Sequence, residues 1–366
     1  MSEEKLVPKL RFSGFNDEWE SYKFDDLFNF QVAGDMKKEL FNDELTDEFK
    51  YPLYANALEN EGLLGYYKDY KYESNSITVT ARGNIGYATV RKNKFSAIGR
   101  LIILTAKINL NMNFFEEYIN NNVKVHIEST GVPQLTAPSL KINKINYPNL
   151  NEQNKISNFL TRLNKKIELL EKKHQCYQDF KKYLMQQIFT QKLRFNFTDE
   201  WDYLDFNKIF KSVSTKKYQI KSAEIMDNGD FEVIDQGQDE IAGYFNDKNK
   251  LCYELPIIIY GDHTTFVKFR DKPFIVGADG VKLLLPKIDA NLKYLFYALE
   301  YFNIKPEGYK RHFSIIKKIN LPLPSLEEQN EISEMFGSVD KKIMYTQKQL
   351  KETKKFKKGL LQQMFV

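Results

Sequence analysis

Two short polar stretches carry residue types that can read the edges of DNA bases. The first holds Arg82 and Asn84 beside glycines and follows a β-rich run. The second, in the later half of the chain, holds Asp262 and His263 in a similar setting. An arginine can donate two hydrogen bonds to guanine, an asparagine can pair with adenine, and an aspartate can accept from the amino group of cytosine. An ordinary polar hairpin would explain any one of these residues, but the clusters together favour DNA contacts.

Further basic and polar residues follow both stretches, as contacts with phosphates require. The region 129–134 adds small hydrogen-bond donors and an amide, and the regions 277–282 and 309–312 add further candidates. The candidate DNA contacts are Arg82, Asn84, Arg91, Lys92, Lys94 and Gln134 in the first half, and Asp262, His263, Thr264, Thr265, Lys268, Arg270, Lys282, Lys310 and Arg311 in the second.

The net charge of +5 is distributed unevenly along the chain. Residues 1–74 carry 9 basic and 17 acidic side chains, a net charge of −8, whereas residues 75–150 carry 9 and 3, a net charge of +6. The second half repeats this order, with −6 over residues 196–255 and +5 over residues 256–325. Chance clustering in a lysine-rich chain is the alternative explanation. The recurrence favours a positive surface that meets phosphates.

The sequence argues against catalysis by this chain. It contains no nucleotide-binding phosphate loop and no Asn/Asp-Pro-Pro-Tyr/Phe motif of amino-methyltransferases. Glu171-x-Lys173 and Glu352-x-Lys354 resemble a nuclease element, but a solvated helix face explains them better. His263 has the chemistry of a base or a metal ligand, yet the 4 histidines show no ligand spacing. We therefore expect neither enzymatic activity, nor a cofactor, nor a metal site.

The sequence also indicates a cellular compartment. Cys176 and Cys252 are the only cysteines and lie far apart, which fits a reducing environment. No stretch has the length and apolar composition of a membrane span, and the first residues lack the layout of a signal peptide. We expect a cytoplasmic protein that makes no membrane contact.

The elements that must position the two polar stretches are encoded twice. Residues 152–190 match residues 328–366 without a gap at an offset of 176, with 16 of 39 positions identical. Residues 9–12 likewise return as residues 192–195. Two near-equal halves predict a pseudo-two-fold molecule, like a dimer fused end to end. Such a molecule suits a ligand with two half-sites, of which duplex DNA is the obvious example.

Both copies of the longer repeat predict a helix with one apolar seam. The seam runs from Ile156 to Ile188 and from Ile332 to Met364 over nearly five heptads. We expect the two helices to pack antiparallel, with one globular domain at each end. Five seam positions are polar, which either sets the register or marks contacts with another subunit. They are His174, Lys181, Thr346, Thr353 and Lys357.

Each helix has a clear start signal. Asn149 and Ser325 lie three residues before Glu152 and Glu328, which is the spacing of a capping box, and a proline precedes each cap. A capping box satisfies two backbone amides at the helix start reciprocally, so both helices should begin here.

The pattern predicts an α+β fold. Two α/β domains, 1–148 and 191–324, are separated by two long antiparallel coiled-coil helices, 149–190 and 325–366, in a pseudo-two-fold internal repeat. Short apolar runs near residues 77, 101, 257 and 281 predict strands, and 111–122 and 290–302 predict short helices.

The doubled motif carries a family resemblance. Pro148-Asn149-Leu150-Asn151-Glu152-Gln153 through Ile156 and Pro324-Ser325-Leu326-Glu327-Glu328-Gln329 through Ile332, each after a variable domain, resemble the specificity subunits of type I restriction–modification enzymes. Residues 261–265 with 276–280 also resemble a segment found in that family. The resemblance covers the whole chain.

The resemblance implies a non-catalytic DNA-recognition subunit. Each variable domain would be a target-recognition domain that reads one half of a split target in double-stranded DNA. The helices would act as a spacer. They would also bind two modification (methyltransferase) subunits and restriction subunits. S-adenosylmethionine, ATP and Mg²⁺ would then bind to those partners. The alternatives are a non-catalytic coiled-coil adaptor with two protein-binding domains, and a nuclease or methyltransferase in its own right. We also expect the helices to set the distance between the half-sites, so that four residues inserted after Thr190 would lengthen the gap.

Overall fold

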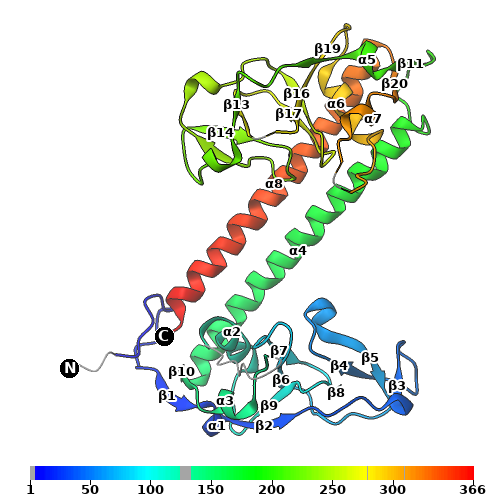
Figure 1. Ribbon diagram of the computed structural model, residues 1–366. Coiled ribbons are helices and arrows are strands. Elements are labelled where there is room, and N and C mark those ends of the chain that lie inside the picture. Colours follow the sequence, from blue (N-terminus) through cyan, green and yellow to red (C-terminus); the bar gives the residue numbers. More distant parts are fainter. Residues whose placement is uncertain (1–4, 124–132, 278, 309) are drawn as a thin grey trace. The chain divides into compact units, whose positions relative to one another are not determined.

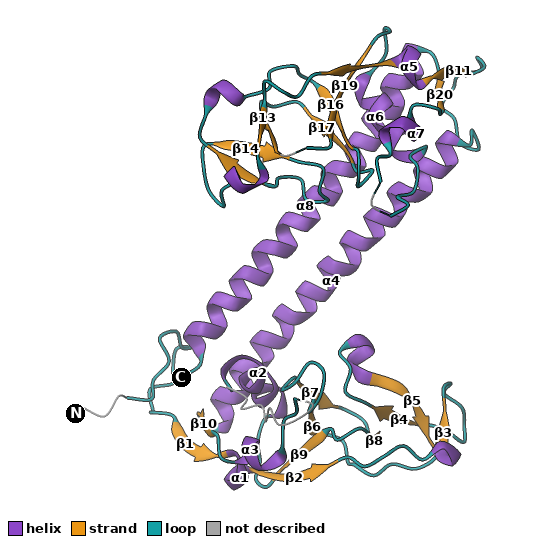
Figure 2. Cartoon of the chain, in the orientation of Figure 1, coloured by secondary structure: helices purple, strands orange, loops and turns teal. Residues whose placement is uncertain are grey.

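The chain forms two compact units, and the first of them combines both ends of the sequence. The computed structural model describes residues 5–123, 133–277, 279–308 and 310–366 (Figures 1 and 2). One unit consists of Met1–Glu171 with Gln349–Val366, and the other of Lys172–Lys348. Each unit therefore contains one globular domain and part of each of the two long helices, α4 (Leu150–Phe189) and α8 (Leu326–Met364).

The first domain is built on two four-stranded sheets. One is antiparallel, in the order β2-β9-β6-β7, and the other is mixed, in the order β3-β5-β4-β8; the pair β1-β10 completes the domain. Its strands are β1 (Glu20–Lys23), β2 (Phe28–Val32), β3 (Phe41–Asn42), β4 (Tyr51–Tyr54), β5 (Leu63–Tyr67), β6 (Ser76–Val79), β7 (Ala88–Arg91), β8 (Ser96–Ala97), β9 (Ile102–Ala106) and β10 (Lys144–Tyr147). Its helices are α1 (Phe24–Leu27), α2 (Met112–Asn122) and α3 (Ala137–Lys141), with 3₁₀ turns η1 (Lys38–Leu40) and η2 (Glu59–Gly62).

The second domain repeats the antiparallel sheet strand for strand, in the order β12-β19-β16-β17. Its mixed sheet has the order β13-β18-β14-β15, so β15-β14-β18 match β5-β4-β8, while the added edge strand, β13 or β3, lies on the opposite side. Its strands are β11 (Asp202–Asp205), β12 (Phe210–Val213), β13 (Gln219–Ile220), β14 (Phe231–Ile234), β15 (Gly243–Phe245), β16 (Ile257–Gly261), β17 (Val267–Arg270), β18 (Ile275–Gly277), β19 (Val281–Pro286) and β20 (Asn320–Leu323), of which β11 and β20 pair. Its helices are α5 (Phe206–Ile209), α6 (Leu292–Tyr301) and α7 (Phe313–Ile316), with 3₁₀ turns η3 (Ser222–Glu224) and η4 (Lys248–Lys250).

The predicted fold class is confirmed: two mixed α/β domains, two long helices and an internal repeat. The four apolar runs form β6, β9, β16 and β19, and the two short helices are α2 and α6. Within the first unit, Lys354 of α8 pairs with Glu171 of α4 at 2.6 Å, and within the second, Lys181 of α4 pairs with Asp340 of α8 at 3.0 Å. The paired segments run antiparallel in each unit, as the repeat predicts.

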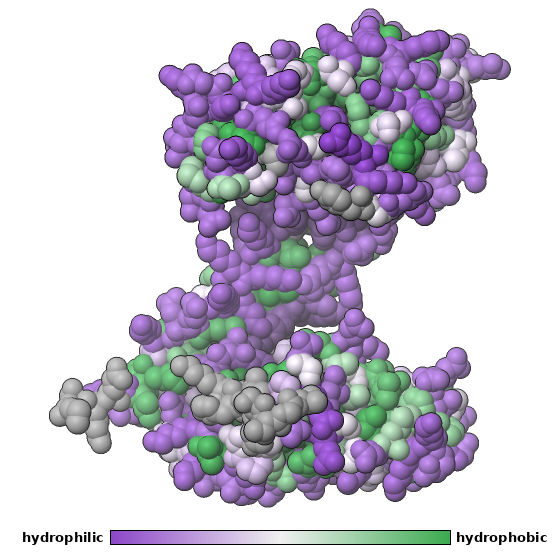
Figure 3. All heavy atoms as spheres, in the orientation of Figure 1, coloured by the Kyte–Doolittle hydropathy of each residue, from purple (hydrophilic) through white to green (hydrophobic). Residues whose placement is uncertain are grey.

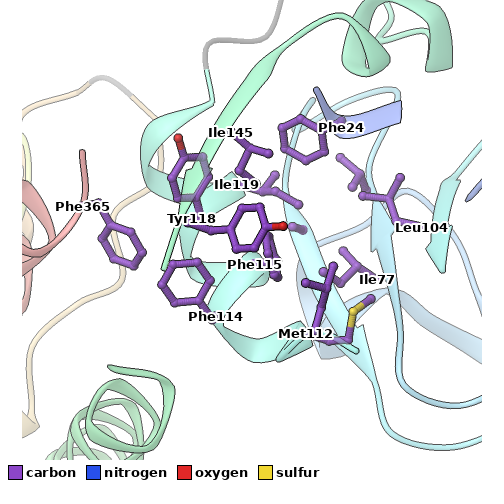
Figure 4. Close-up of a cluster of buried hydrophobic side chains, with 14 of the residues drawn as sticks. Phe24, Ile77, Leu104, Met112, Phe114, Phe115, Tyr118, Ile119, Ile145 and Phe365 are labelled. Atoms are coloured by element: carbon purple, nitrogen blue, oxygen red, sulfur yellow. The ribbon is translucent and has the colours of Figure 1, made fainter. Parts of the chain in front are cut away.

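The core of the first unit joins the domain to both helices. Phe114 and Tyr118 of α2 pack against Phe365, which follows α8 (Figure 4). Ile156 of α4 and Leu361 of α8 belong to the same buried cluster. The second unit has an equivalent cluster, in which Phe189 stacks on Phe336. Burial of these side chains fixes each domain on the helix segments of its unit. Burying one large apolar side chain contributes roughly 1.5–3 kcal/mol relative to leaving it exposed to water.

A buried glutamine explains why Glu-Gln recurs at both helix starts. Gln153 donates from Nε2 to the carbonyl of Pro148 (2.8 Å) and accepts at Oε1 from the backbone N–H of Asn111 (3.0 Å). Gln329 makes the same two bonds, with Pro324 (2.8 Å) and Asn291 (2.9 Å). Asn111 and Asn291 are the N-caps of α2 and α6. One side chain therefore ties the helix start to the domain helix in both halves.

The capping box is only half formed. Asn149 and Ser325 accept from the backbone N–H of Glu152 (3.1 Å) and Glu328 (3.3 Å), as predicted. The glutamate side chains turn elsewhere, which corrects the prediction. The buried carboxylate of Glu152 accepts two bonds of 2.7 Å from Arg11. A charged bidentate partner binds the carboxylate more strongly than one backbone amide would.

The second half uses the same arrangement with one addition. Glu328 accepts from Arg194 at 2.7 and 3.1 Å and from Nε1 of Trp201 at 2.9 Å. Arg11 and Arg194 are equivalent residues of the short repeat at 9–12 and 192–195. Both repeats thus meet at the helix start, where they join the segment before each domain to the long helix.

Polar seam residues pair within each unit. His174 lies 3.2 Å from the hydroxyl of Thr346, and Thr353 donates to its own helix. Lys181 contacts Glu300 of α6 as well as Asp340. Lys357 reaches Glu117 of α2 at 3.0 Å. The two lysines lie where a domain helix docks on the seam, which gives them internal partners of opposite charge.

Candidate nucleic-acid interface

The two polar stretches occupy the same place in the two domains. The first forms the turn 80–87 between the paired strands β6 and β7, and the second forms the turn 262–266 between β16 and β17. Both hairpins lie at the edge of the antiparallel sheet, next to β9 or β19. The first turn is the longer one, so equivalent scaffolds carry different tips.

The first hairpin presents Arg82 and Asn84 to solvent. The backbone around them is held from inside: the Thr80 hydroxyl donates to the carbonyl of Asn84 and accepts from the N–H of Tyr87 at 2.9 Å. The guanidinium of Arg82 lies 3.4 Å from Oε1 of Gln134, a weak bond that DNA could replace. The structure therefore brings these three predicted contacts together. The neighbouring predicted stretch Ser129–Val132 lies outside the described residues.

Lys92 and Lys94 line a separate, open hollow of about 730 Å³ after β7. Tyr51 and Tyr66 contribute to its wall, together with Lys50. The ammonium of Lys94 lies 2.8 Å from the hydroxyl of Tyr70 and 3.2 Å from Glu73, and the bond to Tyr70 raises its pKa. Exposed lysines beside tyrosine rings fit contact with a phosphate backbone better than with base edges.

Arg91 is enclosed within the first domain, and this argues against the predicted DNA contact. It is the last residue of β7 and is only 4% exposed. Its guanidinium lies 3.6 Å from the ring centre of Tyr54 and its Nε donates to Thr78 at 2.9 Å. Burial lowers the pKa of the Arg91 guanidinium. The side chain points into the space between the sheets and holds the hairpin to β4.

At the equivalent position in the second domain, two more predicted DNA contacts, Arg270 and Lys268, have partners within the domain. Arg270, the last residue of β17, is buried and pairs with Glu232 and with Glu240 at 3.3 Å. Lys268 points to the same side, donates to the carbonyl of Asp235 at 3.1 Å and has a pKa lowered by burial. Both cations neutralise acidic residues of the mixed sheet and its loops, which removes them from solvent.

Asp262, Thr264 and Thr265 make their contacts within the domain. Asp262 is 3% exposed; its carboxylate accepts from the backbone N–H of Phe313 at 2.8 Å and lies 3.6 Å from Nζ of Lys282. A carboxylate so enclosed cannot accept from cytosine. Thr265 is buried and Thr264 donates to the carbonyl of Gln236. Burial argues against the predicted DNA contacts of Asp262 and Thr265, whereas Thr264 is half-buried and uses its hydroxyl within the domain.

The remaining candidates of the second domain surround Asp262. The backbone of Asp262 bonds to Gly280 and to His312, both at 2.7 Å, which draws together the turns that carry His263, Lys282, Lys310 and Arg311. Lys310 and Arg311 are exposed, and His263 and Lys282 are half-buried. Lys310 pairs with the nearby Glu307. Ala278 and Tyr309, in the predicted regions 277–282 and 309–312, lie outside the described residues.

The buried His312 was not predicted to have a structural role. Its Nε2 accepts from the N–H of Glu307 at 3.0 Å and its Nδ1 lies 3.2 Å from the carbonyl of Asp262. No group of three or more His, Cys, Asp or Glu side chains in the described part of the chain is placed to hold a metal ion. None of the helices among the described residues has the length and apolar character of a membrane span.

Comparison with known proteins follows the doubled architecture. The family model for the type I restriction modification DNA specificity domain matches residues 16–176 and again residues 198–355. The chain belongs to this family. Each match of the specificity domain contains one of the two hairpins, β6–β7 or β16–β17, and most of one long helix.

Relatives with curated names match part of the chain. A putative type I specificity subunit from Mycoplasma pneumoniae is 30% identical over 174 residues, which cover 44% of this chain and 48% of the relative. A second putative type I specificity subunit from the same organism is 29% identical over 182 residues, covering 47% and 54%. The chain thus spans about half the length of the curated relatives it matches.

Solved structures share the fold over nearly the whole chain. The S subunit of a type I restriction–modification system from M. genitalium superposes with a TM-score of 0.73 at 18% identity, covering 98% of this chain and 99% of that one. A chain from a structure on complex assembly and conformational transition of a type I R-M system gives a TM-score of 0.50 at 13% identity, covering 94% and 96%.

Sequence reasoning missed one polar residue in each specificity domain. Asn56 lies two residues after β4, and Gln236 lies two residues after the equivalent strand β14. The amide of Asn56 contacts the β6–β7 turn, and the amide of Gln236 contacts the β16–β17 turn. The sequence offers only a weak signal for them, namely an amide residue shortly after an apolar run.

Proposed function

We propose that this chain is the DNA-recognition subunit of a type I restriction–modification complex, and that each specificity domain reads one half of a bipartite duplex target. The observation that carries the proposal is the pair of equivalent hairpins, β6–β7 and β16–β17, with unlike tips. A shared scaffold gives both domains the same approach to DNA, and unlike tips give the two half-sites different bases.

The exposed residues divide into base readers and phosphate contacts. Arg82 and Asn84 have the donors and acceptors that distinguish guanine and adenine in the major groove. The lysines around each hairpin supply sequence-independent affinity that falls with salt. Our revised contact set is Arg82, Asn84, Lys92, Lys94 and Gln134 in the first domain, and His263, Lys282, Lys310 and Arg311 in the second.

We further propose that two modification subunits dock on the long helices. Exposed apolar side chains recur there at the repeat offset of 176: Leu169 with Tyr345, and Phe180 with Phe356. Each unit holds one residue of each pair, and Figure 3 shows apolar patches interrupting an otherwise mostly hydrophilic face. Two equal surfaces suit two copies of one partner. Restriction subunits would join the same complex.

In this proposal the chain itself is not an enzyme. S-adenosylmethionine, ATP and Mg²⁺ bind to the partner subunits, and the complex works in the cytoplasm on duplex DNA. Methyl transfer by the isolated chain would contradict this part.

The experiment is to purify the chain with the modification subunits of its own system and to sequence the methylation of host DNA. We expect one target with two defined parts separated by unread bases. Anisotropy measurements with that duplex and a shuffled duplex, at rising salt, would show selective binding that weakens as salt increases. Binding of modification subunits without any preference among duplexes would instead favour the coiled-coil adaptor.

A further inference from the structure

One amide side chain connects two loops at the tip of each specificity domain. Oδ1 of Asn56 accepts from the backbone N–H groups of Ala81 (2.7 Å) and Arg82 (3.3 Å), and its Nδ2 donates to the carbonyl of Gly99. The first contact is with the reading hairpin. The second is with the turn between β8 and β9, so one flat group joins the two sheets of the domain.

The second domain has the same connection, built from a longer side chain. Oε1 of Gln236 accepts from the N–H of His263 at 3.1 Å, and its Nε2 donates to the carbonyl of Asp279 at 3.2 Å. His263 lies in the β16–β17 turn, and Asp279 lies in the turn between β18 and β19, the counterparts of the loops joined by Asn56.

The surrounding backbone is shaped around these amides. Gly99 and Gly280 both have left-handed backbone angles, with φ of +68° and +87°. A Cβ on Gly280 would lie 2.7 Å from Oε1 of Gln236, and one on Gly99 would lie 3.2 Å from Nδ2 of Asn56. Glycine therefore allows both the turn and the close approach of the amide.

An amide side chain suits this connection. The amide offers an acceptor and a donor on one planar group, whereas a carboxylate is an acceptor only and would face the carbonyl with another oxygen. An alanine would leave the N–H of the buried residue Ala81 without this acceptor. The bonds hold the backbone of Arg82 and of His263, from which the proposed contact side chains project.

We propose that Asn56 and Gln236 are positioning residues for DNA recognition, each one setting the reading hairpin of its own domain for its own half-site. This inference rests on the proposed function. A hairpin held in its binding shape loses less conformational freedom on binding, and it discriminates better because its side chains cannot adjust to a wrong base.

The test uses the complex with modification subunits and the variants Asn56→Asp, Asn56→Ala, Gln236→Glu and Gln236→Ala. Methylation rates are measured on duplexes that carry the wild-type target, or that target with one base replaced in either half-site. We expect changes at Asn56 to reduce discrimination in the first half-site by roughly tenfold, the scale of one good base contact, and to leave the second unchanged. Changes at Gln236 should do the reverse.

Two amides elsewhere serve as matched controls. Asn42, the last residue of β3, donates to the carbonyl of Glu44 at 3.0 Å, and Asn246, just after β15, accepts from the N–H of Asp230 at 2.8 Å. Asn42→Ala and Asn246→Ala should alter neither half-site. Hydrogen exchange at the amides of Ala81 and His263 adds a readout that does not need activity, and it should accelerate in the Ala variants, which remove the acceptor, while the core stays protected.

The outcomes separate the two levels of inference. A wild-type complex that methylates without sequence preference contradicts the proposed function itself. A selective wild type whose folded variants keep full discrimination, or lose it equally in both half-sites, overturns the positioning role alone. Unchanged exchange at Ala81 and His263 also overturns it.

Discussion

Arg82, in the turn between β6 and β7, and Arg91, the last residue of β7, have opposite surroundings. Arg82 is exposed at the tip and makes one weak side-chain bond, to Gln134. Arg91 is enclosed at the end of the strand by Tyr54 and Thr78. The two residues carry the same charge, and the sequence predicted a DNA contact for both. Their accessibility, rather than their type, decides which of them can reach a base.

Replacing Arg82 with alanine should relax the first half-site only. The change removes a bidentate donor and is expected to cost about 1–3 kcal/mol of discrimination at one base pair. Methylation sequencing of DNA modified by the Arg82→Ala complex would show degeneracy at that position. A uniform loss across all sequences would make Arg82 a phosphate contact and would contradict base reading.

Replacing Arg91 with alanine should instead destabilise the first domain. The variant loses the bond to Thr78 and the contact with Tyr54 and leaves a cavity, and such changes cost about 2–4 kcal/mol. Denaturant unfolding measures the loss. The half-site preference of the protein that remains folded should match that of the wild type; a shifted preference would restore Arg91 to the DNA contacts.

At the scale of elements, the start of each long helix is a docking point for its domain. Buried Glu152 and Glu328 hold an arginine of the preceding segment, and the adjacent glutamines hold the cap of a domain helix. The repeated Glu-Gln pair therefore joins three elements of each unit. The strong match between the two copies at these positions has a structural cause.

Removing Arg11 should weaken the first unit strongly. Arg11→Ala leaves the fully buried carboxylate of Glu152 without its bidentate partner, and the expected loss of unfolding free energy is about 3–5 kcal/mol. Lys165→Ala removes an exposed pair with Glu168 and should cost less than about 1 kcal/mol. The double variant Arg11→Ala/Glu152→Ala should recover part of the stability. Equal losses for the buried and exposed pairs would show that Glu152 has little role in docking.

Local patterns sufficed for the elements but not for the site. The heptad seam, the caps and the apolar runs are properties of neighbouring residues, so α4, α8 and the β6, β9, β16 and β19 strands could be predicted. Whether Arg91 or Asp262 faces solvent depends on a second sheet or loop that comes from a distant part of the chain. The Asn56 connection is likewise tertiary. The sequence therefore indicated the two polar hairpins but not which of their polar residues are buried.

At the scale of the whole molecule, the long helices are candidates for a ruler between the half-sites. Insertion after Thr190 is a poor test, because the adjacent Phe189 packs on Tyr301 and Phe336 and its displacement would disturb the second domain. Insertion of one matched heptad after Glu171 and another after Lys348, where the compact units divide, keeps both seams in phase.

Seven helical residues add about 10 Å, or roughly three base steps of 3.4 Å. We expect methylation sequencing to show a longer unread gap with both half-sites unchanged. An unchanged gap in an active complex would leave the helices as a docking surface alone. A complex with the heptad inserted in one helix only serves as the control, and it should lose activity because the seams no longer match.

The first unit combines residues from both ends of the chain, and this has a consequence for biosynthesis. Phe365 packs on Trp19 and Phe114, and Leu360, Leu361 and Met364 fill the same core. The ribosome makes these residues only after it has made all of the second domain. The first domain is therefore synthesised first but completed last. Until the end of α8 has been made, the apolar core residues of this domain stay exposed on one side. Folding of the first domain thus requires residues that are synthesised after the second domain. A ribosome that stalls before residue 349 would leave an exposed apolar surface to which chaperones and proteases can bind.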